Sequence, residues 1–285
     1  HDPTGIILNS NTRPNGMIVE RISVPLGVIG IIYESRPNVT VDASVLCLKA
    51  GNSVILRGGK ESYFSNLQLV NSMQMAIEEL GLDKNIIQFI ETTDRTAVDI
   101  MLSDMVDYID VVIPRGGKGL VKKVQEKARV PVIGHLDGIC HLYIDEFADI
   151  DKAVAISENS KLRRTGICGA AETLLIHKKC INTHLPHIVE KLKSGGCEIR
   201  VDEECQKLFP EALLAIEEDW QTEYLEAKIS IKVVDDLYHA IQHIKFYGSK
   251  HTESIITENS NNAEIFLDQV DSAIVMHNTS TQFAD

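Results

Sequence analysis

From residue 28 onward, short and nearly continuous apolar runs alternate with longer amphipathic segments. A strand that is covered on both faces gives such an unbroken apolar run, whereas a half-exposed strand alternates. We therefore predict strands at 28–33, 53–56, 86–90 and 108–113. The segments between and after them predict helices at 42–50, 69–80, 95–102 and 120–127. This alternation is typical of a doubly wound α/β lobe built on a parallel sheet.

A second set of strand and helix patterns follows residues 130–150, which we interpret as a crossing from one lobe to another. It predicts helices at 150–162, 181–193 and 237–245, and strands at 173–176, 198–201, 229–234, 254–256 and 272–276. Ahead of both lobes, two extended segments flank a turn-rich stretch and predict a hairpin within 5–24. The lone Trp220 stands in an acidic stretch and is predicted at the surface.

Composition narrows the class of protein. Hydrophobic content of 44% and charged content of 24% over 285 residues are typical of a globular chain that divides into two lobes. A net charge of −13 argues against a general nucleic-acid-binding protein, although a local basic pocket for a small anionic substrate stays open. No apolar run approaches the length of a bilayer span, so the sequence predicts no membrane segment.

Cysteine and histidine usage bears on compartment and metal chemistry. The six cysteines include no Cys-x-x-Cys pair, which favours reduced thiols in a reducing compartment such as the cytoplasm. The ten histidines are scattered and show no His-Glu-x-x-His spacing. We therefore predict no metal site.

Polar clusters follow three predicted strands, at 34–38, 57–60 and 114–119. In parallel α/β sheets the ligand lies beyond the carboxyl ends of the strands. Gly58-Gly59 and Gly116-Gly117 both have a basic residue on each side, and free backbone N–H groups beside cations are suited to phosphate. Either pair alone is equally consistent with an ordinary turn. The usual Gly-x-Gly-x-x-Gly dinucleotide fingerprint is absent.

Cys168 lies in a Gly- and Thr-rich turn directly before an apolar strand. A thiolate at a strand entrance, with little bulk around it and backbone N–H groups nearby, has the setting of a nucleophile. The competing interpretation is a small buried apolar residue, as most free cysteines are.

Several segments together resemble the gamma-glutamyl phosphate reductase family, within the aldehyde dehydrogenase superfamily. They read PLGVIG at 25–30, YESRPNVTVD at 33–42, VILRGGKE at 54–61, IPRGG at 113–117 and TGICGAAETLL at 165–175, with a further match across 234–255. The resemblance covers essentially the whole chain. It implies an aldehyde dehydrogenase-like fold with two α/β lobes and a small β arm.

The resemblance also implies domain boundaries along the chain. Residues 1–24 correspond to part of an oligomerisation arm, so a homo-oligomer is expected. Residues 25–133 correspond to the NADP-binding domain and 134–276 to the catalytic domain. Residues 277–285 correspond to the start of a return segment whose continuation is missing from this sequence.

The implied reaction is the NADPH-dependent reduction of L-glutamyl 5-phosphate to L-glutamate 5-semialdehyde and phosphate in proline biosynthesis. Cys168 would form a thioester, and its backbone N–H would stabilise the oxyanion. The substrate is a small molecule, and a functional link to glutamate 5-kinase, which makes it, is expected. Whether the two enzymes share one chain stays open.

Further site residues follow from the same resemblance. Arg57 and Lys60 stand where the superfamily binds the adenine ribose, and two cations there suit the 2′-phosphate of NADP. Gly116 and Gly117 are expected to contact the cofactor's phosphates, and Glu223 to hold the nicotinamide ribose. Arg36 and Asn38 are expected to hold the substrate's phosphate or carboxylate; a structural ion pair is the alternative for Arg36.

Two departures from the superfamily pattern concern the catalytic groups. Hydrolytic aldehyde dehydrogenases carry a general-base glutamate where this chain has Gly134, so a thioester here would be spared hydrolysis. The superfamily's oxyanion asparagine is also replaced, with Ser35 nearest its place. His135, His141 and His251 are interpreted as structural. The alternative functions are another acyl-phosphate or acyl-CoA reductase of the superfamily, and a non-enzymatic scaffold.

Overall fold

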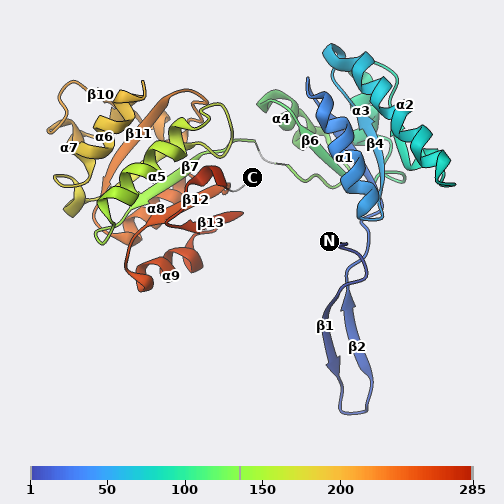
Figure 1. Ribbon diagram of the computed structural model, residues 1–285, viewed down its shortest axis with the longest axis horizontal. Coiled ribbons are helices and arrows are strands. Elements are labelled where there is room, and N and C mark those ends of the chain that lie inside the picture. The colour runs from blue at the N-terminus through green and yellow to red at the C-terminus, as the bar shows by residue number, and fades with distance from the viewer. Residues whose placement is uncertain (1, 135, 284–285) are drawn as a thin grey trace. The chain divides into compact units, whose positions relative to one another are not determined.

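The computed structural model describes residues 2–134 and 136–283 (Figure 1). They form two compact units, residues 1–136 and residues 137–285, and the stretch that joins them lies close to the predicted crossing at 130–150. His135, which we interpreted as structural, lies outside the described residues, as do His1, Ala284 and Asp285. Over the described ranges, no helix has the length and apolarity that a membrane span requires.

Unit 1 begins with the predicted hairpin. Its strands β1 (Ile7–Thr12) and β2 (Ile18–Ile22) pair antiparallel, and every residue in both is exposed. Large apolar side chains are among them, including Ile7, Ile18 and Ile22, at 46–64% exposure. A two-stranded ribbon that covers neither of its faces buries too little apolar surface to be stable by itself. The hairpin therefore leaves apolar side chains exposed on both of its faces.

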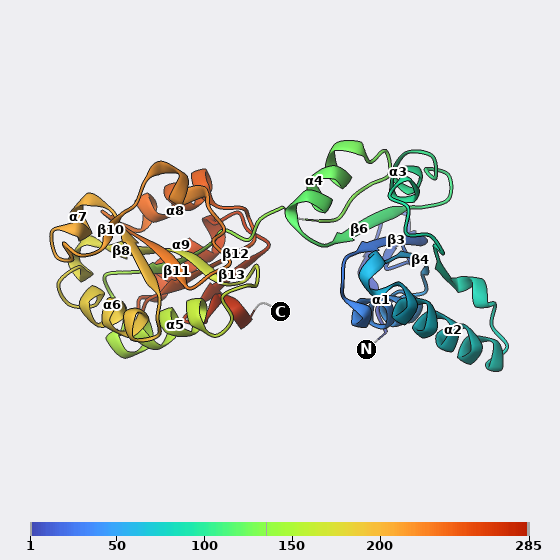
Figure 2. The same ribbon diagram turned by 90° about the horizontal axis from the view of Figure 1, so that it is seen from above.

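The rest of unit 1 is a four-stranded parallel sheet in the order β5-β4-β3-β6. Its strands are β3 (Val28–Tyr33), β4 (Ser53–Arg57), β5 (Ile87–Phe89) and β6 (Val111–Arg115). Its helices are α1 (Pro37–Lys49), α2 (Tyr63–Glu79), α3 (Thr96–Ser103) and α4 (Lys118–Lys127). One face packs on α1 and α2 and the other on α3 and α4, so both faces are apolar (Figure 2). This is the predicted doubly wound arrangement.

Unit 2 is built on a seven-stranded sheet in the order β10-β9-β11-β8-β7-β12-β13, in which all the pairings are parallel. Its strands are β7 (Cys140–Ile144), β8 (Ala171–His177), β9 (Glu198–Val201), β10 (Leu213–Leu214), β11 (Lys228–Val234), β12 (Thr252–Ile256) and β13 (Ile274–His277). Helices α5 (Ile150–Leu162) and α6 (Leu185–Ser194), with the short α7 (Glu203–Gln206), contribute to one core. Helices α8 (Leu237–Tyr247) and α9 (Ser260–Gln269) contribute to the other.

Local sequence explains where several of these elements start and stop. Pro37 occupies the first turn of α1, where its missing N–H costs nothing. Asp149 caps α5, because its carboxylate accepts from the N–H of Lys152 at 2.9 Å. Gly51, with φ +73°, ends α1 in the left-handed conformation that glycine adopts readily.

Several sequence predictions in these units were wrong or incomplete. Residues 140–144, which we placed in the crossing between the lobes, form β7, which pairs with β8 and β12 within the unit 2 sheet. Trp220 is only 5% exposed, because its ring packs edge-on against His243 and lies 5.0 Å from the Lys232 ammonium. The prediction that Trp220 lies at the surface, which rested on its acidic neighbours in the sequence, was therefore wrong. Helix α9 was not predicted, because its start at Ser260 is polar and only Ala263 and Phe266 are buried.

Candidate active site

The residues predicted to contact the substrate lie where β3 meets α1, at the carboxyl end of the unit 1 sheet. Ser35 has a left-handed backbone, with φ 39°, and its hydroxyl donates to Glu61 Oε2 at 3.5 Å. Arg36 is exposed and immediately precedes α1. Asn38 is also exposed and donates to Asp42 Oδ2 at 3.1 Å. All three side chains are therefore accessible to a ligand in unit 1.

The two predicted cofactor cations differ in their surroundings. Arg57 is only 7% exposed, and its guanidinium donates to the carbonyls of Gly58, Thr93 and Asp94 at 2.8–3.0 Å. Burial and the nearby Arg95 lower its pKa. Lys60, by contrast, is exposed at the end of β4. Arg57 thus fixes the loop after β5, while Lys60 offers its charge to solvent.

The Gly116-Gly117 turn before α4 is already engaged by a carboxylate. Glu34 Oε2 accepts from the Gly117 N–H at 3.0 Å. A Cβ on Gly116 would lie 2.6 Å from that oxygen and 2.8 Å from Leu120 Cδ2, so a larger residue would require the Glu34 and Leu120 side chains to move. The positive end of α4 therefore attracts an anion, and the anion in this structure is the side chain of Glu34.

Gly134 lies against Pro114. A Cβ at this position would approach the proline Cγ to 2.9 Å and its Cδ to 3.2 Å. A side chain such as the glutamate of hydrolytic enzymes would therefore require the backbone or the proline ring to move.

In unit 2, Cys168 lies in the turn between α5 and β8 and is partly exposed. The Ala170 N–H donates to the Ile167 carbonyl at 3.0 Å, which closes a turn with Cys168 and Gly169 at its centre. Gly169 is fully buried, and a Cβ there would lie 3.2 Å from the Thr281 carbonyl. The turn thus leaves the thiol partly accessible while its backbone is enclosed.

Gly138 and Glu223 hold the backbone of this turn. A Cβ on Gly138 would lie 2.1 Å from the Cys168 carbonyl oxygen, so the two backbones are in direct contact. The Gly138 N–H donates to Glu223 Oε1 at 2.9 Å. Glu223, predicted as a cofactor residue, is therefore joined to the nucleophile turn through one intervening residue.

Behind the turn lies a fully buried ion pair. Lys161 from α5 and Glu172 from β8 are 2.5 Å apart, and both side chains are 0% exposed. Burial raises the pKa of Glu172 to about 7, although Lys161 opposes that shift. Lys161 was not predicted from the sequence, because its partner is eleven residues away without a helical or strand spacing. The available signal was Glu172 itself, an ionisable residue inside an apolar strand.

A second thiol and two histidines lie on the other side of the turn. Cys140 Sγ donates to the Cys168 carbonyl at 3.1 Å and lies 3.7 Å from His251 Nδ1. Burial and the charge of Glu253 raise the pKa of Cys140 well above its ordinary value. His141 Nδ1 is 3.0 Å from Glu253 Oε2, and both side chains are buried. The His141–Glu253 contact joins β7 to β12.

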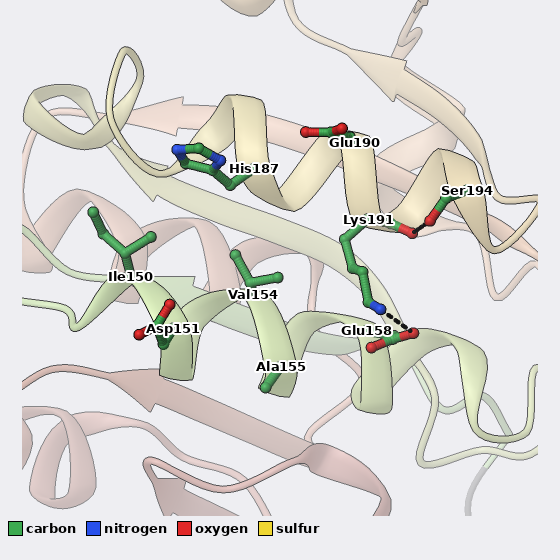
Figure 3. Close-up of a pocket in the computed structure, with 9 residues that line it drawn as sticks. All are labelled: Ile150, Asp151, Val154, Ala155, Glu158, His187, Glu190, Lys191 and Ser194. Carbon is green, nitrogen blue, oxygen red and sulfur yellow. Dashed lines mark hydrogen bonds and ion pairs between the residues drawn. The ribbon is translucent and has the colours of Figure 1, made fainter.

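A separate groove runs between α5 and α6 on the surface of unit 2 (Figure 3). Ile150 and Val154 line it, and the Lys191–Glu158 ion pair of 3.3 Å spans it. The nine lining residues drawn in Figure 3 include none of those predicted for the site. Elsewhere in residues 2–134 and 136–283, no group of three or more His, Cys, Asp or Glu side chains could hold a metal ion.

Comparison with known proteins bears on this arrangement. A gamma-glutamyl phosphate reductase of Mesorhizobium japonicum is 53% identical over 284 residues, which cover 100% of this chain and 66% of that protein. One from Bartonella bacilliformis is 54% identical, with 100% and 69% covered. The Aldehyde dehydrogenase family profile matches residues 4–206. The chain belongs to the aldehyde dehydrogenase family. The resemblance predicted from the motifs is thereby confirmed.

The solved structure of gamma-glutamyl phosphate reductase from Thermotoga maritima has a TM-score of 0.96 at 45% identity, covering 100% of this chain and 69% of that one. This likeness confirms the predicted aldehyde dehydrogenase-like α/β fold. The chain spans about two thirds of the length of the curated relatives it matches.

Proposed function

We propose that the chain is the larger part of an NADPH-dependent reductase that converts L-glutamyl 5-phosphate into L-glutamate 5-semialdehyde and phosphate, as a step of proline biosynthesis. The observation that carries this proposal is identity of 53–54% to gamma-glutamyl phosphate reductases along the whole chain. The partly exposed Cys168 in its enclosed turn supplies the chemistry.

The reaction begins on Cys168. Its thiolate attacks the acyl carbon, a C–S bond forms, and the bond to the phosphate oxygen breaks as phosphate leaves with the electron pair. The Cys168 N–H stabilises the oxyanion of the intermediate, with Ser35 as a second donor. The cofactor, when bound, supplies the hydride that the thioester carbon accepts. The resulting thiohemiacetal collapses to the aldehyde and returns the thiolate of Cys168.

The glycine at position 134 supports reduction over hydrolysis. The position that carries a glutamate in hydrolytic enzymes is Gly134, whose backbone lies against Pro114. Without a base, water attacks a thioester slowly, so the intermediate persists until hydride transfer.

The residues of unit 1 fit an NADP cofactor in part. Lys60 is exposed and suits the 2′-phosphate, whereas Arg57 is bound to backbone carbonyls and is assigned the ordering of the adjacent loop. Gly116 and Gly117 would approach the cofactor's phosphates once the hydrogen bond from the Gly117 N–H to Glu34 is broken. Glu223 would hold the nicotinamide ribose, and Arg36 and Asn38 the phosphate or carboxylate of the substrate.

The wider setting of the enzyme belongs to the same proposal. The exposed hairpin of residues 7–22 supports a homo-oligomer, and the substrate, an unstable acyl phosphate, calls for a nearby glutamate 5-kinase. The six free cysteines support a reducing compartment, the cytoplasm.

The test is the reverse reaction of the full-length protein with L-glutamate 5-semialdehyde, phosphate and NADP⁺. We expect phosphate-dependent formation of NADPH, lost by a factor of at least about 10³ in Cys168→Ala. Cys197→Ala is the control, because that thiol is buried and burial raises its pKa to about 11. Unchanged activity of Cys168→Ala would refute the thioester, and a requirement for coenzyme A in place of phosphate would favour an acyl-CoA reductase.

A further inference from the structure

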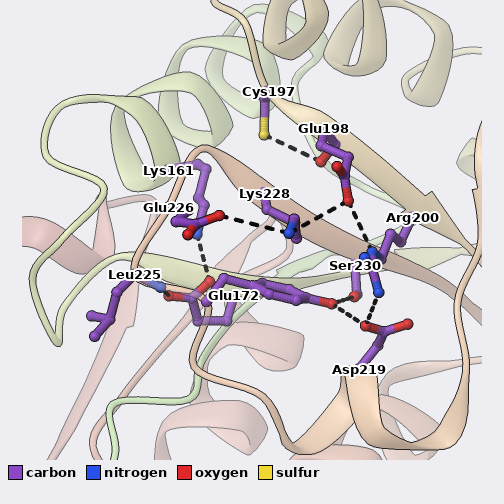
Figure 4. A network of polar contacts seen from close by, with 11 residues as sticks. Lys161, Glu172, Cys197, Glu198, Arg200, Asp219, Leu225, Glu226, Lys228 and Ser230 are labelled. Atoms are coloured by element: carbon purple, nitrogen blue, oxygen red, sulfur yellow. Dashed lines mark hydrogen bonds and ion pairs between the residues drawn. The ribbon is translucent and has the colours of Figure 1, made fainter.

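The Lys161–Glu172 pair lies at the base of the nucleophile turn. Lys161 is in the last turn of α5, seven residues before Cys168. Glu172 is the second residue of β8, four residues after Cys168. Their charged atoms are 2.5 Å apart and inaccessible to solvent. Figure 4 shows the two side chains directed at one another beneath the strand entrance.

Stability does not account for this pair. Moving two charges out of water costs more than their attraction returns in many proteins, so a well-packed apolar pair is often as stable or more so. The raised pKa of Glu172 has burial as its largest cause, ahead of the attraction of Lys161, and the charge of Glu223 adds to it. Burying these two charges therefore costs electrostatic free energy. We look for the benefit that offsets this cost in the residues that the pair contacts.

The pair holds the segment 223–225. Glu172 Oε1 accepts from the N–H of Leu225 at 3.4 Å (Figure 4). The Lys161 ammonium lies 5.9 Å from the Tyr224 ring centroid. Tyr224 also contacts Asp219 and Ser230 through its hydroxyl, at 2.8 and 2.7 Å. Leu225 has a left-handed backbone, with φ 54°, which is uncommon for a branched residue and persists only where the surroundings fix it.

This segment in turn reaches the nucleophile. Glu223 accepts from the Gly138 N–H, and Gly138 lies against the Cys168 carbonyl with no space for a Cβ. On the other side, Gly166 of the nucleophile turn faces the Leu225 carbonyl, 3.8 Å from where its Cβ would be. One buried ion pair is therefore connected to both sides of the Cys168 turn.

We propose that Lys161 and Glu172 are positioning residues, which hold the segment 223–225 so that the Cys168 thiol and the Glu223 carboxylate keep a fixed separation. This inference rests on the proposed function, in which Cys168 carries the acyl group and Glu223 holds the nicotinamide ribose. Displacing a reacting group by about 1 Å costs on the order of 100-fold in rate, so an arrangement that fixes these two groups acts directly on turnover.

The experiment compares two double variants of the full-length protein. K161M/E172L removes both charges and the acceptor for the Leu225 N–H. K161M/E172Q removes both charges but keeps an amide oxygen at the acceptor position. We measure kcat and KM for NADP⁺, the rate at which iodoacetamide alkylates Cys168, and the midpoint of thermal unfolding.

We expect K161M/E172L to unfold at or above the temperature of the unmodified protein, with kcat lowered about 100-fold, KM for NADP⁺ raised and the alkylation rate altered. K161M/E172Q should recover at least a third of the lost kcat. Leu185→Ala is the stability control, because this fully buried side chain of α6 belongs to the apolar core, and its loss should lower the melting temperature without changing kcat.

Three results overturn the inference. The first is a K161M/E172L variant whose kcat, KM for NADP⁺ and alkylation rate stay within twofold of the unmodified protein. The second is an equal loss of kcat in both double variants. The third is failure of K161M/E172L to fold, since the pair would then be needed for stability. Cys168→Ala, measured in the same assay, separates this from the proposed function. If that variant is inactive while K161M/E172L is unaffected, only the positioning role fails.

Discussion

The two units place their predicted site residues in opposite surroundings. In unit 1, Ser35, Arg36, Asn38 and Lys60 are exposed, and Ser35 and Asn38 donate hydrogen bonds to the carboxylates of Glu61 and Asp42. In unit 2, the turn that carries Cys168 is supported by groups that water does not reach. The first arrangement suits recognition of a charged ligand, while the second suits a nucleophile whose position must not vary.

The difference in burial also determines what substitutions should do. Exposed charges are screened and contribute about 0–1 kcal/mol each to folding. Removing one partner of a buried pair leaves an uncompensated charge and costs about 3–5 kcal/mol. Substitutions in unit 1 should therefore change affinity without changing stability, while those behind Cys168 should change turnover, stability or both.

Gly138→Ala should give the largest effect, because it disturbs the backbone contact behind the nucleophile. The new Cβ would lie 2.1 Å from the Cys168 carbonyl oxygen and 2.7 Å from its carbonyl carbon, so one of the two backbones must shift. We expect a loss of kcat of about 100-fold or more, with overpacking costing about 1–3 kcal/mol in stability. Gly166→Ala, in the same turn, is the matched control, since its Cβ meets nothing closer than 3.8 Å. Equal activity of the two variants would contradict the enclosed turn.

The pH dependence of stability should reveal the buried carboxyl of Glu172. Its pKa is raised from the ordinary 4.5 to about 7 by burial, with Lys161, the Leu225 N–H and Glu223 as the facing groups. Because folding raises the pKa of Glu172, the protonated carboxyl stabilises the fold fully below pH 4.5, and this stabilisation is lost as the pH rises to about 7. The loss is roughly 3 kcal/mol, measured as the difference between the unmodified protein and K161M/E172L in urea unfolding across this range. Parallel pH profiles would show that Glu172 does not titrate there.

Lys60→Ala tests the exposed side of the comparison. We expect the KM for NADPH to rise about tenfold, corresponding to one lost contact with the 2′-phosphate, while the melting temperature stays unchanged. The KM for NADH provides the internal control, because NADH lacks that phosphate. A parallel rise in both KM values would assign Lys60 to a general electrostatic effect.

Glu34→Gln should give the smallest effect. The carboxylate of Glu34 faces the start of α4 through the Gly117 N–H at 3.0 Å, where a negative charge contributes about 0.3–1 kcal/mol. Calorimetry should show a correspondingly small fall in melting temperature, which high salt should reduce further. A fall independent of salt would point to packing rather than charge.

Much of the fold could be predicted from apolar patterning. The strand at 28–33, the helix at 150–162 and the strand at 198–201 occur at the predicted boundaries. For 28–33 the reason is that burial on both faces leaves an unbroken apolar run. The last strand of unit 1 was displaced, at Val111–Arg115 in place of 108–113, since a proline within it obscured its end. Pattern alone also missed α9, whose polar face dominates its sequence.

The sequence by itself determined most of the succession of strands and helices, the family to which the chain belongs and the choice of Cys168 as the candidate nucleophile. Only the tertiary structure decided that Trp220 is buried, that Arg57 faces backbone carbonyls and that Lys161 meets Glu172. Periodicity reports whether a position is covered, but the identity of what covers it depends on elements far apart in the chain. Since the energy of a charge depends on that neighbour, the electrostatic setting of Cys168 became apparent only in the folded protein.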